Sequence, residues 1–164
     1  GPAKNVAKEL MSIPSFEEPS NEIFSELKVV LKNLKKIILM VAGTASEKLG
    51  TKIGEEQELM MNISDMIIDT YMLESALLKT EKLTSKEGPI KNQERISMCI
   101  NFLHSTIDKF QKNGKEAIYA LSEGDEQKIL LLGLKRFTKV KPDNLKEHRR
   151  SIAKKLIEEN LYCF

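Results

Sequence analysis

The chain has 164 residues, 41% of them hydrophobic and 30% charged, with two cysteines and a net charge of +2. This length and composition are typical of one soluble globular domain. The small net charge argues against a nucleic-acid binder, which carries a strong basic excess. The longest apolar run, residues 37–42, is too short to span a bilayer. No signal peptide is visible, so we expect a cytoplasmic protein, with association at the membrane surface as the alternative.

The beginning of the chain predicts a short helix over residues 3–12 and a linker that ends at Pro19. We therefore assign residues 1–19 to this helix and linker, and residues 20–164 to one helical-bundle domain. Ser20 can cap a first long helix, and Gly50 fits the position after its carboxyl end. Apolar residues in this helix recur at alternating steps of three and four, which is typical of one buried face. They are Phe24, Leu27, Leu31, Leu34, Ile38, Val41, Ala45 and Leu49.

A second long helix is expected over residues 52–85. Between positions 59 and 78, 13 of 20 residues are apolar, which is too many for one face and predicts a central helix with neighbours around it. Asn62, Asp65 and Asp69 fall on one narrow stripe, which we interpret as a structural polar stripe that satisfies groups on neighbouring helices. The alternative is that the two carboxylates, four residues apart, do acid–base work or hold a cation.

Four methionines of this helix have two interpretations as well: Met60, Met61, Met66 and Met72. They either belong to the core or form an adaptable binding surface, and we expect core.

The remaining helices follow from Pro and Gly positions. Pro89 opens a third long helix to about residue 121, in which Gly114 marks either a kink or a close contact with another helix. Ser122 and Asp125 resemble a capping box for a helix over residues 124–138, and a last helix covers residues 143–160. The buried face of the third helix is expected at Ile96, Ile100, Leu103, Ile107, Phe110, Ala117 and Leu121. Short connections between helices favour antiparallel neighbours. The fold class is therefore all-α, an up-and-down antiparallel bundle of three long helices and two or three shorter ones.

No constellation of catalytic residues is visible. The two histidines, His104 and His148, have no second ligand at helical metal spacing, and no glycine-rich phosphate-binding motif is present. We therefore assign no catalytic, cofactor-binding or metal-binding residue, and we expect the chain not to be an enzyme on its own.

The segment over residues 135–155 is strongly basic, with nine cations against Asp143 and Glu147, a local net charge of +7. It fits three roles: contact with an anionic membrane surface, docking against an acidic face of another domain, or a solvated face balanced by nearby acids. The candidate contact residues are Lys135, Arg136, Lys139, Lys146, Arg149 and Arg150.

Two stretches carry a family resemblance. In residues 52–71, KIGEEQELMMNISDMIIDTY, the informative positions are Lys52, Ile53, Glu56, Gln57, Leu59, Asp65, Ile68, Asp69 and Tyr71. In the last helix they are Ser151, Ile152, Lys154, Leu156 and Glu158. These positions, with the early segment ELMSIPSF, resemble the C-terminal helical extension of very-long-chain-type acyl-CoA dehydrogenases, in particular of bacterial members.

The resemblance implies a parent flavoprotein that uses FAD to oxidise fatty acyl-CoA between its α and β carbons. This chain would then be a non-catalytic accessory domain that packs on the catalytic core of the same polypeptide or aids assembly, including formation of a homodimer. Such a domain should expose an apolar or methionine-rich patch where the core docks. The amphipathic membrane segment of the mitochondrial members is not matched by residues 3–19. The alternative function is a stand-alone helical interaction module, with a groove for a partner helix or a symmetric dimer contact. An independent enzyme is the third and least supported alternative.

Overall fold

The structure, a computed structural model, describes residues 23–164, and these residues form helices without any strand. The elements are α2 (Ile23–Leu49), the 3₁₀ helix η1 (Gly50–Glu55), α3 (Gln57–Glu87), α4 (Gln93–Leu121), α5 (Gly124–Phe137) and α6 (Leu145–Glu159). The helix and linker expected over residues 1–19, and the cap expected at Ser20, lie outside the described residues.

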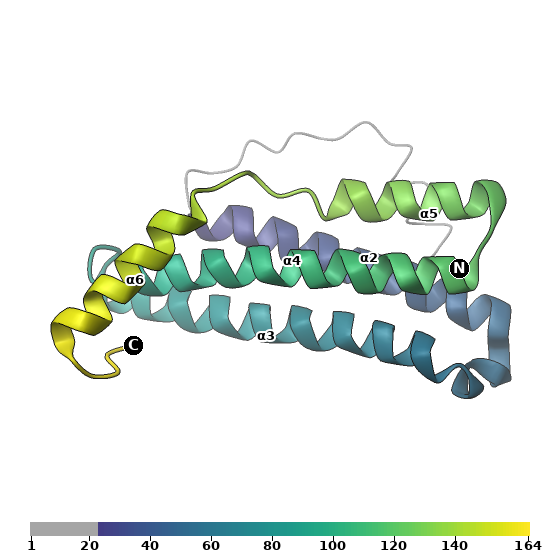
Figure 1. Cartoon of the computed structure of the whole chain (residues 1–164), viewed down its shortest axis with the longest axis horizontal. Helices are drawn as coiled ribbons and strands as arrows, with labels where there is room; N and C mark the ends of the chain where they lie inside the picture. Colours follow the sequence, from purple (N-terminus) through teal and green to yellow (C-terminus); the bar gives the residue numbers. More distant parts are fainter. Residues whose placement is uncertain (1–22) are drawn as a thin grey trace.

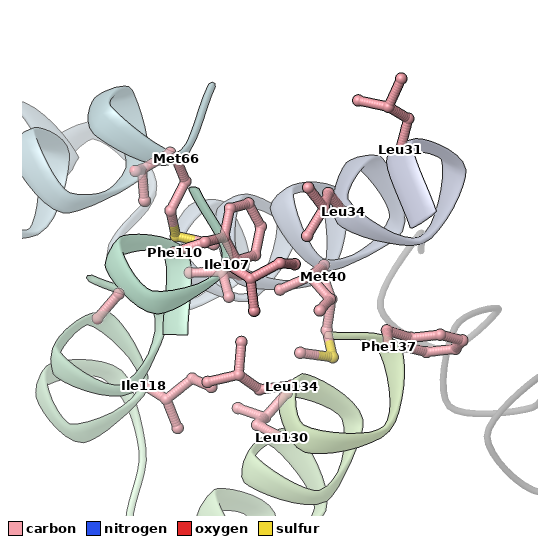
Figure 2. Packing of buried hydrophobic residues seen from close by; sticks show 14 of the residues in the cluster. Leu31, Leu34, Met40, Met66, Ile107, Phe110, Ile118, Leu130, Leu134 and Phe137 are labelled. Carbon is pink, nitrogen blue, oxygen red and sulfur yellow. The ribbon is translucent and has the colours of Figure 1, made fainter. Parts of the chain in front are cut away.

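Successive helices α2, α3, α4 and α5 run in alternating directions, and α6 crosses obliquely near one end of α4 (Figure 1). The expected all-α, up-and-down antiparallel bundle with three long helices is therefore confirmed. Its core lies where α2, α3, α4 and α5 meet. Figure 2 shows Leu34, Met66, Phe110 and Leu134, one from each helix, turned toward this common interior.

The central helix is α4 and not α3, contrary to the expectation from the sequence. Helix α4 contacts α2, α3, α5 and α6, whereas α3 contacts α2, α4 and η1 within the described residues. One face of α3 is buried in the bundle, at Leu59, Ile63, Met66, Thr70, Leu73, Leu77 and Thr80. The apolar residues on its other side face outward, because no described helix covers that side.

The contact alternative for Gly114 is confirmed, since α4 is continuous through this position. A Cβ atom at Gly114 would lie 2.8 Å from the Cδ1 atom of Leu134 on α5. The missing side chain lets α5 approach α4 closely, and this approach holds α5 in the core.

Two local features differ from the sequence expectation. The capping box is wrong: the Ser122 hydroxyl donates back to the Ile118 carbonyl at 2.9 Å, and Asp125 pairs with Lys128 instead. The third long helix begins at Gln93 rather than at Pro89. The turn before it is held by Asn92, whose buried side-chain amide donates to the Gly88 carbonyl at 2.9 Å.

Candidate docking surface on helix α3

The most unusual surface of the described residues is the solvent-facing side of α3, which is apolar. We call it the outer face of α3 and define it by seven exposed large side chains: Met60, Met61, Ile67, Ile68, Tyr71, Met72 and Leu78. Tyr71 is 67% exposed, Met61 66% and Ile68 56%. At 3.6 residues per turn these side chains share a sector of roughly 140°, and the only other residues of this stretch in that sector are Ser64 and Ser75.

Charged residues border the outer face on both sides but do not enter it. On the side nearer α2, Glu74 pairs with Lys35 at 2.6 Å, and Glu81 pairs with Lys28. On the opposite side lies the exposed Asp65. An apolar centre with a charged border is the arrangement found in protein–protein interfaces, where the buried core is depleted of charge and the rim is polar.

The four methionines of α3 divide between the core of the bundle and the outer face. Met66 is fully buried, as expected for core, but Met60, Met61 and Met72 are exposed, so the core interpretation is wrong for these three. Methionine side chains are flexible and polarizable and adapt to irregular partners, which suits an exposed docking surface.

The polar stripe predicted at Asn62, Asp65 and Asp69 lies along one edge of α3. Asp65 is exposed, while Asn62 and Asp69 are half-buried. Neither carboxylate has an ion-pair partner among the described residues, and no group of three or more His, Cys, Asp or Glu residues there could hold a metal ion. The stripe was expected to satisfy groups on helices all around α3. Because the described helices do not surround α3, this reason does not hold, and the structural role of the stripe stays a prediction.

The six candidate cations of the basic segment do not gather into one patch. Lys135 and Arg136 lie in the last turn of α5 and Lys139 follows it, whereas Lys146, Arg149 and Arg150 lie on α6. The connection over residues 140–144 separates the two groups (Figure 1). Arg149 donates to the Asn101 amide oxygen, and Arg150 lies 3.6 Å from Glu147. Contact with an anionic surface stays a prediction for these residues.

Helix α6 packs on α4 without a fully buried residue of its own, and several polar contacts join the two helices. His148 stands at the centre of these contacts: its Nδ1 atom lies 3.0 Å from Ser97 Oγ on α4, and its Nε2 atom lies 3.1 Å from Asp143 Oδ2. Farther along α6, the Lys155 ammonium lies 3.2 Å from Glu94 of α4. His148 therefore serves the packing of α6.

The contact with His148 changes the pKa of the Asp143 carboxyl. Partial burial alone would raise its pKa. Hydrogen bonds from His148 and from the Asn144 backbone N–H, together with the charges of His148 and His104, instead hold the pKa of Asp143 below its usual value of 3.8.

Comparison with known proteins gives the family. Residues 33–136 match the family described as "Acyl-CoA dehydrogenase, C-terminal domain". The chain belongs to this family. It is similar to a probable acyl-CoA dehydrogenase of Bacillus subtilis (strain 168), with 32% identity over 160 residues. It is also similar to the crystal structure of an acyl-CoA dehydrogenase complexed with FAD from Bacillus anthracis, with a TM-score of 0.89 and 33% identity.

The coverage is unequal in the two directions. The alignments cover 98% and 99% of this chain but 27% of each relative. This acyl-CoA dehydrogenase C-terminal domain therefore corresponds to about a quarter of the length of these relatives, and the resemblance seen in the sequence is confirmed at the level of the family. No described helix combines the length and the apolar character that a membrane span needs.

The sequence contained the signal for the outer face but not its location. The high apolar content of α3 was visible, and it was interpreted as burial within the bundle. Sequence alone could not show that one side of the helix has no neighbour among the described helices.

Proposed function

We propose that this chain is the accessory C-terminal domain of an FAD-dependent acyl-CoA dehydrogenase, non-catalytic by itself, and that it docks on the catalytic part of that enzyme. The outer face of α3 is the docking surface. The single observation that carries the proposal is this charge-free apolar face on a helix of a domain that matches only 27% of its relatives' length. An exposed apolar patch of this kind marks an interaction site.

The N-termini of the described α-helices offer the flavin phosphates no favourable site. Nucleotide phosphates are commonly bound at a glycine-rich helix N-terminus, and α5 is the one described α-helix that begins with glycine. There Gly124 is followed by Asp125 and Glu126, whose carboxylates would repel a pyrophosphate. The residues present therefore do not fit the FAD phosphates, and the proposal places FAD and the reaction in the catalytic part.

The second candidate function, a stand-alone interaction module, uses the same face. Two copies could pair through α3, because a symmetric contact needs only one self-complementary apolar surface. The outer face is consistent with this alternative, so the test must separate a partner in the same polypeptide from a second copy.

Methionine oxidation tests the docking directly. Met61 and Met72 lie on the outer face, and Met66 of the same helix is fully buried and provides an internal control. Peroxide converts exposed methionine to its sulfoxide, and peptide mass spectrometry measures the rate at each position. In the isolated domain we expect fast oxidation at Met61 and Met72 and slow oxidation at Met66. In the complete enzyme, Met61 and Met72 should be slowed to the rate of Met66.

Two results would separate the alternatives. If Met61 and Met72 of the isolated domain become protected from oxidation only as its concentration rises, and analytical ultracentrifugation shows a dimer, the result would favour pairing with a second copy. Unchanged oxidation of Met61 and Met72 in the complete enzyme at low concentration would overturn the docking surface. As a matched pair of variants, Ile68→Lys should loosen the domain from the enzyme, because a buried unpaired charge is costly. Leu132→Lys, equally exposed on α5, which does not contact α3, should not.

A further inference from the structure

The chain forms a pocket on the side of α3 next to α4, apart from the outer face. Helix α6 ends at Glu159, and Asn160 adopts a left-handed conformation with φ of 50° that turns the chain back. The last residues then return toward α3 (Figure 1). The rings of Tyr162 and Phe164 meet edge to face with centroids 6.0 Å apart, and the Lys155 ammonium lies 5.9 Å from the Phe164 ring.

These two aromatic rings close one side of a pocket of about 260 Å³ between α3 and α4. Small-molecule sites typically occupy about 300–1,000 Å³, so the pocket suits a small ligand. Its apolar walls are formed by Leu83 of α3 and by Met98 and Phe102 of α4, together with the two rings of the tail.

The floor of the pocket has no free polar group. The Thr80 hydroxyl donates to the Ala76 carbonyl at 2.9 Å and lies 3.1 Å from the Cys99 sulfur. The Cys99 thiol is buried, and burial raises its pKa above the usual value of 9.0, so it stays protonated and neutral. A ligand that reaches this floor would meet apolar surface and hydrogen-bonding groups that are already satisfied.

The charges at the walls have one sign. Lys79 and Arg95 line the pocket, and none of the residues that line it is acidic. Arg95 also contacts Asn92 and Glu87, but a guanidinium has five N–H donors and keeps some of them for a ligand. Lys79 has no ion-pair partner within the part of the chain that the structure describes.

From this combination we infer that the pocket binds an anionic amphiphile, an alkyl chain that ends in a carboxylate. The chain lies against Met98, Phe102 and the aromatic tail, and the carboxylate meets Lys79. This inference does not rest on the proposed docking, because none of the seven residues of the outer face lines the pocket.

Titration with alkyl carboxylates tests the inference, with methyl NMR signals as the readout. Decanoate should give saturable shifts at the Met98 and Leu83 methyl groups, with a Kd of about 1 mM or tighter. Each methylene removed, from decanoate to octanoate to hexanoate, should weaken binding by about fourfold per carbon. Uncharged 1-decanol should bind more weakly than decanoate.

Three variants assign the parts of the site. Lys79→Gln should weaken decanoate by about threefold and leave 1-decanol unchanged, whereas Phe164→Ala should weaken both. Lys82→Gln, an exposed lysine of α3 that does not line the pocket, is the matched control and should change neither. Absence of saturation, shifts confined to Ile68 and the rest of the outer face, or an unchanged Kd for Lys79→Gln would each overturn the inference.

Discussion

Replacement of Gly114 by alanine tests how tightly α5 is packed on α4. The new Cβ atom would lie 2.8 Å from Leu134 Cδ1 and 3.2 Å from Leu134 Cδ2. Non-bonded carbon atoms pack best at about 3.5–4.0 Å, so the added methyl overlaps the leucine. Leu134 is 1% exposed and lies between α4 and α5 beside Ile118 and Leu130 (Figure 2). It cannot rotate away without displacing these neighbours.

Two opposing effects set the size of the change in the free energy of unfolding. Alanine in place of glycine in a helix interior stabilises by about 1 kcal/mol, and an added methylene in a well-packed core costs about 1–3 kcal/mol. The net expectation for Gly114→Ala is therefore a destabilisation of roughly 1 kcal/mol. In a Leu134→Ala background, which alone costs about 2–5 kcal/mol, the overlap is gone. The same glycine substitution should then stabilise by about 1 kcal/mol.

Urea denaturation followed by far-UV circular dichroism measures this double-mutant cycle, with the slope m checked for each variant so that the transitions can be compared. The sign change between the two backgrounds is the decisive result. Stabilisation by Gly114→Ala in the wild-type background would show that α5 yields at this contact, and the argument for tight packing would fail.

Three further predictions concern buried and titrating groups. The Thr106 hydroxyl is buried without a hydrogen-bond partner, so Thr106→Val should raise the free energy of unfolding by about 1 kcal/mol. Thr70→Val, which removes a hydroxyl that donates to a carbonyl at 2.8 Å, should lower it. Because burial raises the Cys99 pKa above 9.0, the unfolded chain loses this proton first. The free energy of unfolding should therefore fall above pH 9, by up to about 1.4 kcal/mol per pH unit. The Cys99→Ala variant should lack this loss. If the two proteins lose stability in parallel as the pH rises, the prediction is contradicted. The lowered pKa of Asp143 has the opposite sense: its stabilisation, through His148, is present above pH 3.8 and lost as the pH falls below it. The free energies of unfolding of wild type and Asp143→Asn, measured as the pH is lowered, should converge below pH 3.8. A difference that stays constant with pH would refute the stabilising role of Asp143.

The helices and their order could be predicted from the sequence because periodicity and Pro or Gly positions are local signals. For Gly114 the sequence left a kink and a helix contact open, and the structure shows the contact with Leu134. Asn92 was missed, because its fully buried amide serves a turn whose carbonyl acceptors are fixed only by the folded backbone. The capping box was wrong because a serine at a helix end can donate to the preceding helix as readily as it caps the next one, and Ser122 does so. The pocket was not foreseen, since it depends on where the tail after Asn160 returns.

Helix α3 shows a different limit of prediction from sequence, and the exposed side of α4 in the same chain provides a comparison. Both helices bury one face in the bundle, and α4 places mostly charged and polar groups on its exposed side: Ser105, Asp108, Lys109, Lys112, Lys115 and Glu116. Between Met60 and Leu78, the exposed side of α3 has seven large apolar residues, and its one exposed charge, Asp65, lies at the border. A helix that only packed within this bundle would have no reason to differ from α4 in this way, because exposed apolar side chains add nothing to the bundle's stability and promote association. The apolar content of α3 therefore fits a helix with a neighbour on each of two sides, and not the central helix that the sequence predicted. Under the proposed docking, one is the α2–α4 layer and the other is the catalytic part of the enzyme.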